Sequence, residues 1–264
     1  MTEAELTRVR ASMAASTHRV SIVDTGSGRV VVKVQRPARS AWRARALDAM
    51  ARGLGITLLR AVPAHGGARG QEIEVERLHA LRAVGLHVPE VLHVEPGFAV
   101  LELFDGPNLV SLVEQGGTAG FEAWRRGLAA IVEVHARGAA LSHAFARNFI
   151  VTATGLGMID FEDDPLETMP LEVAQARDWL AYLHSTLWLL DRRLPEIQAA
   201  LAVRLADESP TVRALVEAAG RRLAPLRHLP NSRRVFGREA IGARALGAVF
   251  PLPAIAFTTI DGIL

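Results

Sequence analysis

Lys33 is the only lysine of this 264-residue chain, in which every other basic side chain apart from histidine is arginine. It lies near the end of the β-branched run Val30–Val34, a pattern typical of a buried strand. A lysine ammonium is a compact charge with rotatable donors, and it binds phosphate groups in that form. The alternative is a chance surface lysine, but a surface lysine rarely follows three consecutive valines. We therefore take Lys33 as a functional residue.

A carboxylate in the following helix is a candidate partner for Lys33. The periodicity of residues 72–84 predicts a helix that Gly85 ends, and Glu74 falls on its apolar face. A buried carboxylate needs a cationic partner, and we expect Lys33 to be that partner. The alternatives are a half-exposed glutamate at the edge of the face or a pair with Arg77 along the helix.

Two oxygen-bearing side chains flank a predicted hairpin further along the chain. Residues 149–151 and 158–159 are its predicted strands, with Asn148 before the first and Asp160 after the second. An amide and a carboxylate brought together suit Mg²⁺, which takes few protein ligands beside phosphate oxygens and water. A loop with Asx turns is the alternative. The acidic residues 162–164 that follow are either a further carboxylate for the site or a solvated loop.

The elements that must position these side chains divide into a strand-rich first part and a helical remainder. Hydrophobic periodicity and turn residues predict strands at 18–24, 29–35, 89–94 and 98–103. They predict helices at 38–52, 72–84, 109–113, 121–138, 171–193, 195–206 and 210–225. The glycine-rich stretch 65–70 is predicted as a loop. The small residues 11–16 could form a loop that covers a phosphate, although they match no glycine-rich motif. The predicted fold class is α+β.

Composition excludes several kinds of site. The chain has no cysteine, which rules out disulfides, cysteine-ligated zinc and thiol nucleophiles. Its net charge is only +2, but residues 29–69 carry nine basic side chains and one acid, Asp48. Such a segment attracts phosphates, anionic lipid or nucleic acid, and a solvated helix face is the alternative. The first residues lack a basic and then apolar leader, so we expect no signal peptide and a cytoplasmic protein.

The last part of the chain, residues 233–264, is predicted as an apolar tail. Residues 245–260 carry no charge, but they fall short of the ~20 residues that a spanning helix needs, and Pro251 and Pro253 interrupt them. We expect the tail to pack on the helical part. The alternative is contact with an anionic membrane surface, helped by nearby arginines, which would suit a lipid-linked substrate and a place on the inner membrane.

In their order and spacing these residues resemble the protein-kinase-like superfamily. The resemblance is to small bacterial members: lipopolysaccharide-core kinases, atypical kinases of the Rio and KEOPS type, and aminoglycoside phosphotransferases. It covers roughly residues 10–190. It implies a bilobal fold, with a small β-rich N-lobe at 1–102 and a helical C-lobe at 103–232. In such kinases a strand lysine contacts the α- and β-phosphates of ATP and pairs with a helix glutamate, while an asparagine and an aspartate hold Mg²⁺.

The resemblance assigns roles residue by residue. Lys33 in Val-Val-Val-Lys and Glu74 in Glu-Val-Glu-Arg would bind the nucleotide. Asn148 in Ala-Arg-Asn-Phe-Ile-Val and Asp160 in Ile-Asp-Phe-Glu would bind Mg²⁺. Leu103 lies in the stretch Leu-Glu-Leu-Phe-Asp-Gly that resembles the hinge of the family and would contact the nucleotide.

Two further residues resemble structural positions of the family. His135 in Glu-Val-His-Ala-Arg-Gly resembles the lead-in to the catalytic loop. Asp178 in Gln-Ala-Arg-Asp-Trp-Leu resembles the buried helix aspartate that braces this loop.

The chain departs from the family where the catalytic base would lie. Five residues before Asn148, where the family carries an aspartate, this sequence has His143, and residues 141–149 contain no acid. The family's histidine two residues earlier is Leu141, and Asp-Phe-Gly has become Asp-Phe-Glu. A neutral His143 could accept the substrate proton, or it could pack the loop of a protein that binds ATP without turning it over.

These features predict an ATP-dependent phosphotransferase that uses Mg²⁺ and acts on an envelope sugar, such as lipopolysaccharide, or on a protein. A catalytically impaired pseudokinase that acts as an interaction module is the second hypothesis. The third is a helical protein that binds anionic surfaces without a nucleotide. No feature indicates a specific nucleic-acid partner.

Overall fold

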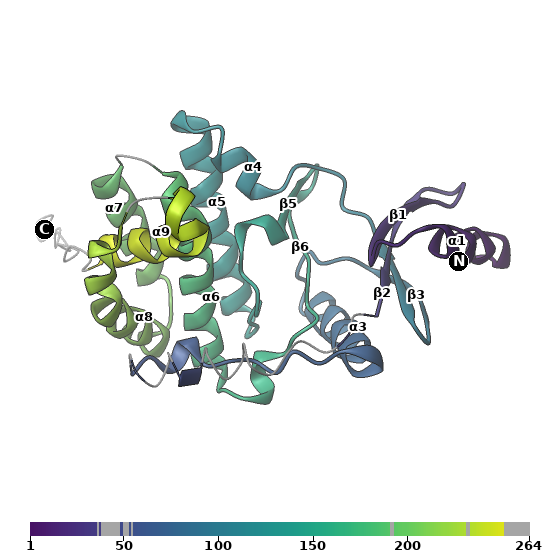
Figure 1. Ribbon diagram of the computed structural model, residues 1–264, viewed down its shortest axis with the longest axis horizontal. Coiled ribbons are helices and arrows are strands. Elements are labelled where there is room, and N and C mark those ends of the chain that lie inside the picture. The colour runs from purple at the N-terminus through teal and green to yellow at the C-terminus, as the bar shows by residue number, and fades with distance from the viewer. Residues whose placement is uncertain are drawn as a thin grey trace, which may run out of the picture.

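The computed structural model describes residues 1–35, 37, 48–49, 53, 55–190, 193–230 and 233–250. The fold is mixed α+β, as the sequence predicted. Figure 1 shows the larger sheet and its covering helix at one end of the molecule and a group of helices at the other. The helix Gly67–Ala83 and a short hairpin of residues 149–158 lie between these two ends. The helix predicted at residues 38–52 lies largely outside the described residues.

The larger sheet has four antiparallel strands in the order β1-β2-β4-β3. Its strands are β1 (Val20–Asp24), β2 (Arg29–Val34), β3 (Val91–Glu95) and β4 (Phe98–Glu102). They confirm the four predicted strands within a few residues. In the register of the sheet, Lys33 of β2 lies opposite Val20 of β1 and Ala99 of β4. Lys33 therefore sits on an inner strand, with a neighbouring strand on either side.

Helix α1 (Glu3–Ala15) covers one face of this sheet. Thr2 and Glu5 form a reciprocal capping box at its start, and the fully buried Val9 packs on the small cluster that contains Val32 and Phe98. The predicted phosphate-covering loop at residues 11–16 is wrong for residues 11–15, because they belong to this helix. Val9 anchors this helix on the sheet, and Met13, within the run of small residues, packs against the same cluster, which favours helix there.

Helix α3 (Gly67–Ala83) carries Glu74 and lies between the sheet and the helical end (Figure 1). It begins earlier than predicted, inside the glycine-rich stretch 65–70 that composition assigned to a loop. Packing accounts for the difference, because Gly70 is buried and a Cβ there would lie 2.9 Å from the carbonyl oxygen of His65. Glycine is thus needed for the close approach and does not end the helix here.

The remaining helices form the other end of the molecule. They are α4 (Leu109–Val113), α5 (Gly117–Ala136), α6 (Leu171–Thr186), α7 (Leu194–Ala206), α8 (Pro210–Leu223) and α9 (Arg233–Val249). Their main core contains the large, fully buried side chains Trp124, Trp179 and Tyr182. Helix α6 ends at Thr186, before the predicted Arg193, where the Thr186 hydroxyl donates to the Tyr182 carbonyl and accepts from Trp124. The hairpin of β5 (Phe149–Thr152) and β6 (Gly155–Met158) joins this core through Phe149.

The described part of the predicted tail packs on the helical end, which was the first expectation for it. Leu246, Val249 and Phe250 are buried there, and Gln198 of α7 donates a 2.9 Å hydrogen bond to the Val249 carbonyl. Residues 251–264 lie outside the described residues. No helix in the described part of the chain combines the length and the apolar character that crossing a membrane requires.

Candidate functional site

Lys33 and Glu74 form a buried ion pair between strand β2 and helix α3. The Lys33 ammonium lies 2.5 Å from Glu74 Oε1, and the two side chains are only 11% and 7% exposed. Burial raises the pKa of Glu74, although the adjacent ammonium opposes the rise. The predicted pairing is confirmed. The alternative positions of Glu74, at a half-exposed edge or paired with Arg77, are wrong.

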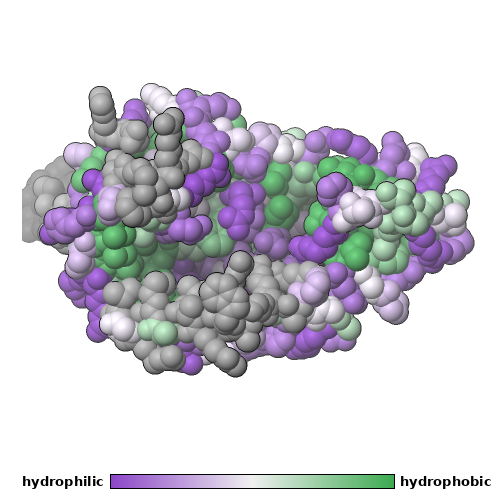
Figure 2. All heavy atoms as spheres, in the orientation of Figure 1, coloured by the Kyte–Doolittle hydropathy of each residue, from purple (hydrophilic) through white to green (hydrophobic). Residues whose placement is uncertain are grey.

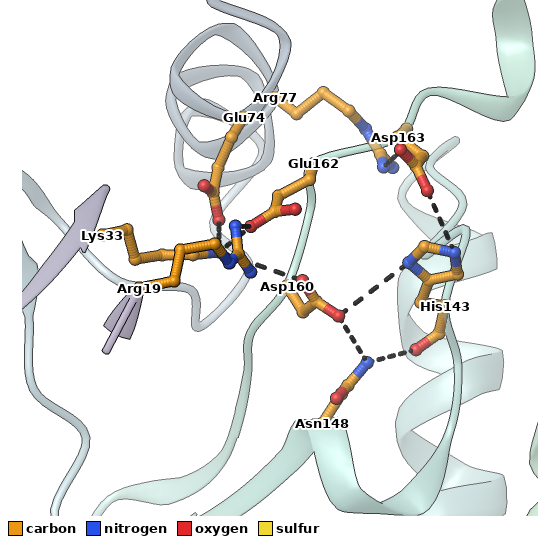
Figure 3. A network of polar contacts seen from close by, with 9 residues as sticks. All are labelled: Arg19, Lys33, Glu74, Arg77, His143, Asn148, Asp160, Glu162 and Asp163. Carbon is orange, nitrogen blue, oxygen red and sulfur yellow. Dashed lines mark hydrogen bonds and ion pairs between the residues drawn. The ribbon is translucent and has the colours of Figure 1, made fainter. Parts of the chain in front are cut away.

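Two more carboxylates face the same ammonium (Figure 3). Glu162 Oε1 lies 2.9 Å and Asp160 Oδ1 lies 3.8 Å from the Lys33 nitrogen. Burial alone would lower the pKa of Lys33, but the three carboxylates outweigh it and raise the pKa above the ordinary value. Lys33 is therefore charged at neutral pH.

Arg19, which sequence reasoning missed, completes this charge cluster. Its guanidinium donates a 2.5 Å hydrogen bond to Glu162 Oε1, the oxygen that also contacts Lys33. Burial works to raise the pKa of Glu162, but Lys33 and Arg19 together lower it to about 2. Glu162 and Asp163 are buried, so the prediction of a solvated acidic loop is wrong for both. The hairpin register could have revealed Arg19, because Val20 lies opposite Lys33.

Asn148 and Asp160 meet at the base of the β5–β6 hairpin, as the sequence predicted. The Asn148 amide nitrogen lies 3.5 Å from Asp160 Oδ2 and donates a 2.9 Å hydrogen bond to the His143 carbonyl. The backbone N–H of Ile159 donates to the Asn148 carbonyl and so aligns the two ends of the hairpin. Among the described residues no cluster of three or more His, Asp and Glu side chains is arranged to hold a metal ion. A carboxylate and an amide oxygen are ligands that Mg²⁺ takes beside phosphate and water, but in this structure Asn148 turns its amide nitrogen toward Asp160.

The backbone has an unusual conformation at Asp160 itself and at Ser142, the residue before His143. In the described part of the chain, two residues other than glycine have a positive φ: Ser142 at 72° and Asp160 at 73°. Such conformations cost on the order of 1–3 kcal/mol each and cluster at functional sites. In this conformation the Asp160 side chain lies between Lys33 and Asn148.

His143 occupies the position where the resemblance placed a catalytic base. Its Nε2 lies 3.3 Å from Asp163 Oδ2 and its Nδ1 lies 3.9 Å from Asp160 Oδ2. The side chain is 14% exposed, and the ring stacks on Phe145. Figure 3 shows the imidazole between the two carboxylates. The structure thus brings His143 together with Asn148 and Asp160.

A buried polar cluster braces the segment that carries His143. Asp178 of α6 accepts a 2.6 Å hydrogen bond from the backbone N–H of Leu141, as expected for its bracing position. His135 lies between Asp178 Oδ2, at 3.4 Å, and Glu208 Oε1, at 2.7 Å. Burial alone would lower the pKa of His135, but these two carboxylates raise it. Glu208 was missed because nothing in its local sequence distinguishes it from a surface residue after a helix.

A cavity of about 380 Å³ adjoins these charged groups. Its apolar lining comes from the sheet, α3 and the hairpin, and its polar end carries Lys33, Glu74, Asn148 and Asp160. Leu103, the predicted hinge residue, also lines it. The volume falls in the range of small-molecule sites. Figure 2 shows apolar atoms on the visible face of the molecule, between the end that holds the larger sheet and the helical end.

Comparison with protein-family models finds no match, and no curated protein is significantly similar to the chain.

Proposed function

We propose that this chain binds Mg·ATP in the cavity and transfers its terminal phosphate, within a bilobal protein-kinase-like fold. The observation that carries the proposal is the convergence of two separate pairs at one end of an apolar cavity. The Lys33–Glu74 pair comes from β2 and α3, and the Asn148–Asp160 pair comes from the ends of the hairpin. Lysine and a Mg²⁺ site together are the groups that nucleotide phosphates require.

Each group has a defined role in this proposal. The apolar lining, with Leu103, would take the base, and Lys33 would contact the α- and β-phosphates. Asn148 and Asp160 would hold Mg²⁺, which when bound neutralises phosphate charge. The predicted N-lobe at 1–102 and C-lobe at 103–232 would close the cavity between them. The acceptor class, an envelope sugar or a protein hydroxyl, rests on the family resemblance.

His143 decides between an active kinase and a binding module. A general base contributes ~10²–10⁴-fold to a reaction, whereas phosphoryl transfer depends mainly on positioning and charge. His143 would accept the acceptor's proton while Asp163 orients the ring. The second candidate function, a pseudokinase that binds partners, is favoured by the engagement of Lys33 with Glu162 and by the histidine at the base position.

Calorimetric titration with Mg·ATP tests nucleotide binding. We expect wild type to bind, Lys33→Ala to bind at least tenfold more weakly, and the exposed Arg82→Ala on α3 to bind like wild type. Absence of binding to wild type would refute the proposal.

Phosphate release and autophosphorylation assays then separate the kinase from the pseudokinase. Turnover that falls in Asp160→Ala and in His143→Ala supports the enzyme. Binding without turnover in wild type supports the interaction module, and turnover that survives Asp160→Ala contradicts catalysis at this site.

A further inference from the structure

Arg19 lies beside Lys33 at the polar end of the cavity. Its carbonyl accepts a 2.8 Å hydrogen bond from the backbone N–H of Val34, which fixes the residue at the start of β1. The side chain is 37% exposed and lines the cavity together with Lys33 and Asp160. Unlike the buried Lys33, this guanidinium is accessible to a ligand that enters from solvent.

Glu162 holds Arg19 and Lys33 through a single oxygen atom. Glu162 Oε1 lies 2.5 Å from Arg19 Nη1 and 2.9 Å from Lys33 Nζ. One anionic oxygen between a guanidinium and an ammonium is also the arrangement in which such cations bind a phosphate oxygen. The two cations thus converge on a position suited to an anion, and a side chain of the same protein supplies that anion.

The charge balance around this position is unfavourable for a further anion. Two cations, Arg19 and Lys33, face three carboxylates: Glu74, Asp160 and Glu162. A nucleotide phosphate that approaches Lys33 meets the charge of Glu162 in a partly buried setting, where charges are poorly screened. Mg²⁺ at Asp160 would offset one carboxylate and Lys33 offsets Glu74, which leaves Glu162 as the direct competitor.

We propose that Arg19 is a second phosphate-binding residue of this site and that Glu162 competes with the nucleotide phosphates for Arg19 and Lys33. This inference rests on the proposed function, since the anion is taken to be a phosphate of the bound nucleotide. It adds a contact that the pattern of Lys33, Glu74, Asn148 and Asp160 does not include. It also makes Glu162 a residue that sets nucleotide affinity.

The test compares a ligand that has phosphates with one that lacks them. Mg·ATP is titrated calorimetrically into wild type, Arg19→Ala, Arg19→Lys and Glu162→Gln, and adenosine is measured by competition. We expect Arg19→Ala to weaken ATP binding about 10- to 100-fold, the equivalent of one charge-assisted hydrogen bond, and Arg19→Lys to weaken it less. Glu162→Gln is expected to tighten ATP binding several-fold. Adenosine affinity should stay the same in all three variants.

Controls separate this inference from folding and from the proposed function. Arg10→Ala removes an arginine of α1 that pairs with Glu3 and Glu95 away from the cavity, and it should bind ATP like wild type. Melting temperatures identify unfolded variants. If Arg19→Ala is unfolded, the ATP affinity of Arg19→Lys tests the role of Arg19 instead. If wild type binds ATP but Arg19→Ala binds equally well, or if Glu162→Gln weakens binding, this inference alone is overturned. If wild type binds no ATP, the proposed function and the inference both fail.

Discussion

Arg77 of α3 and Ala140 lie 63 residues apart in the chain, yet the Arg77 guanidinium donates a 2.6 Å hydrogen bond to the Ala140 carbonyl. It donates another, also 2.6 Å, to the carbonyl of Asp163. One buried side chain thereby ties the helix that carries Glu74 to the segments on either side of the β5–β6 hairpin. This tie bears on the geometry of the candidate site, because Glu74 lies on that helix and Asn148 and Asp160 lie at the ends of that hairpin.

Arg77→Met is therefore expected to lower the free energy of unfolding by on the order of 2–4 kcal/mol. Methionine replaces the aliphatic stem of Arg77 with an apolar side chain of comparable length, but it leaves the carbonyls of Ala140 and Asp163 without their charged donor. Urea denaturation measures the change. The control is Arg125→Met on α5, where the side chain is exposed and pairs with Glu122 at 3.0 Å. That control should lose less than about 1 kcal/mol, and an equal loss in the two variants would contradict the role of Arg77.

His135 should make stability depend on pH. Because its pKa is raised in the folded protein by Asp178 and Glu208, the charged form stabilises the fold. This contribution is complete below the ordinary pKa of about 6.5 and is lost as the pH rises through the higher pKa of the folded state. Wild type should therefore lose stability above about pH 6.5, by at most about 1.4 kcal/mol per pH unit from this group.

The measurement is the free energy of unfolding at intervals from about pH 6 to pH 9. His135→Gln should remove this part of the slope, whereas the exposed His79→Gln on α3 should keep the wild-type profile. A His135→Gln profile parallel to that of wild type would show that the pKa of this histidine does not change on folding, which would contradict the prediction.

The positive φ of Ser142 predicts that glycine at this position gives a more stable protein than alanine does. A positive φ of 72° costs a serine on the order of 1–3 kcal/mol, while glycine loses about 0.5–1 kcal/mol of chain entropy. Ser142→Gly should thus be more stable than Ser142→Ala by roughly 1 kcal/mol, or about 2–4 °C in melting temperature. The two variants both lack the hydroxyl, so calorimetry of this pair isolates the backbone. An alanine variant as stable as the glycine variant would refute strain at this residue.

The parts of the site that the sequence predicted are those that follow from local rules. Glu74 falls on the apolar face of a helix and so requires a cation, and Asn148 and Asp160 flank a hairpin whose turn residues are evident. Arg19 and Glu208 were missed because their roles come from residues distant in the chain, at Glu162 and at His135. A local pattern describes a side chain's own element, whereas a partner is set by how elements pack.

The errors in the fold have the same origin. Residues 11–15 and the start of α3 are rich in alanine, serine or glycine, and such residues form helix or loop according to what they pack against. The fully buried Val9 and the close approach of Gly70 to His65 decide for helix in these two places. The strands, whose β-branched runs lie between turn residues, did not depend on such contacts and were predicted within a few residues.

The last prediction concerns the docking of the segment after α9. Phe250 is 3% exposed, and its ring lies against Gly220 of α8 so closely that a Cβ at Gly220 would overlap it. Gly220→Ala should therefore cost about 1–3 kcal/mol through overpacking, despite the higher helix propensity of alanine. In a Phe250→Ala background the overlap is gone, and the same substitution should gain up to about 1 kcal/mol.

A double-mutant cycle by urea denaturation measures this reversal of sign. Phe250→Ala alone should cost about 3–5 kcal/mol, as expected for a large buried aromatic side chain, while the 59%-exposed Val203→Ala on α7 should change stability by about 0.5 kcal/mol or less. If Gly220→Ala has the same effect in both backgrounds, Phe250 does not pack on α8. An effect of Gly220→Ala on stability that has opposite signs in the two backgrounds would show that this part of the predicted apolar tail belongs to the helical core.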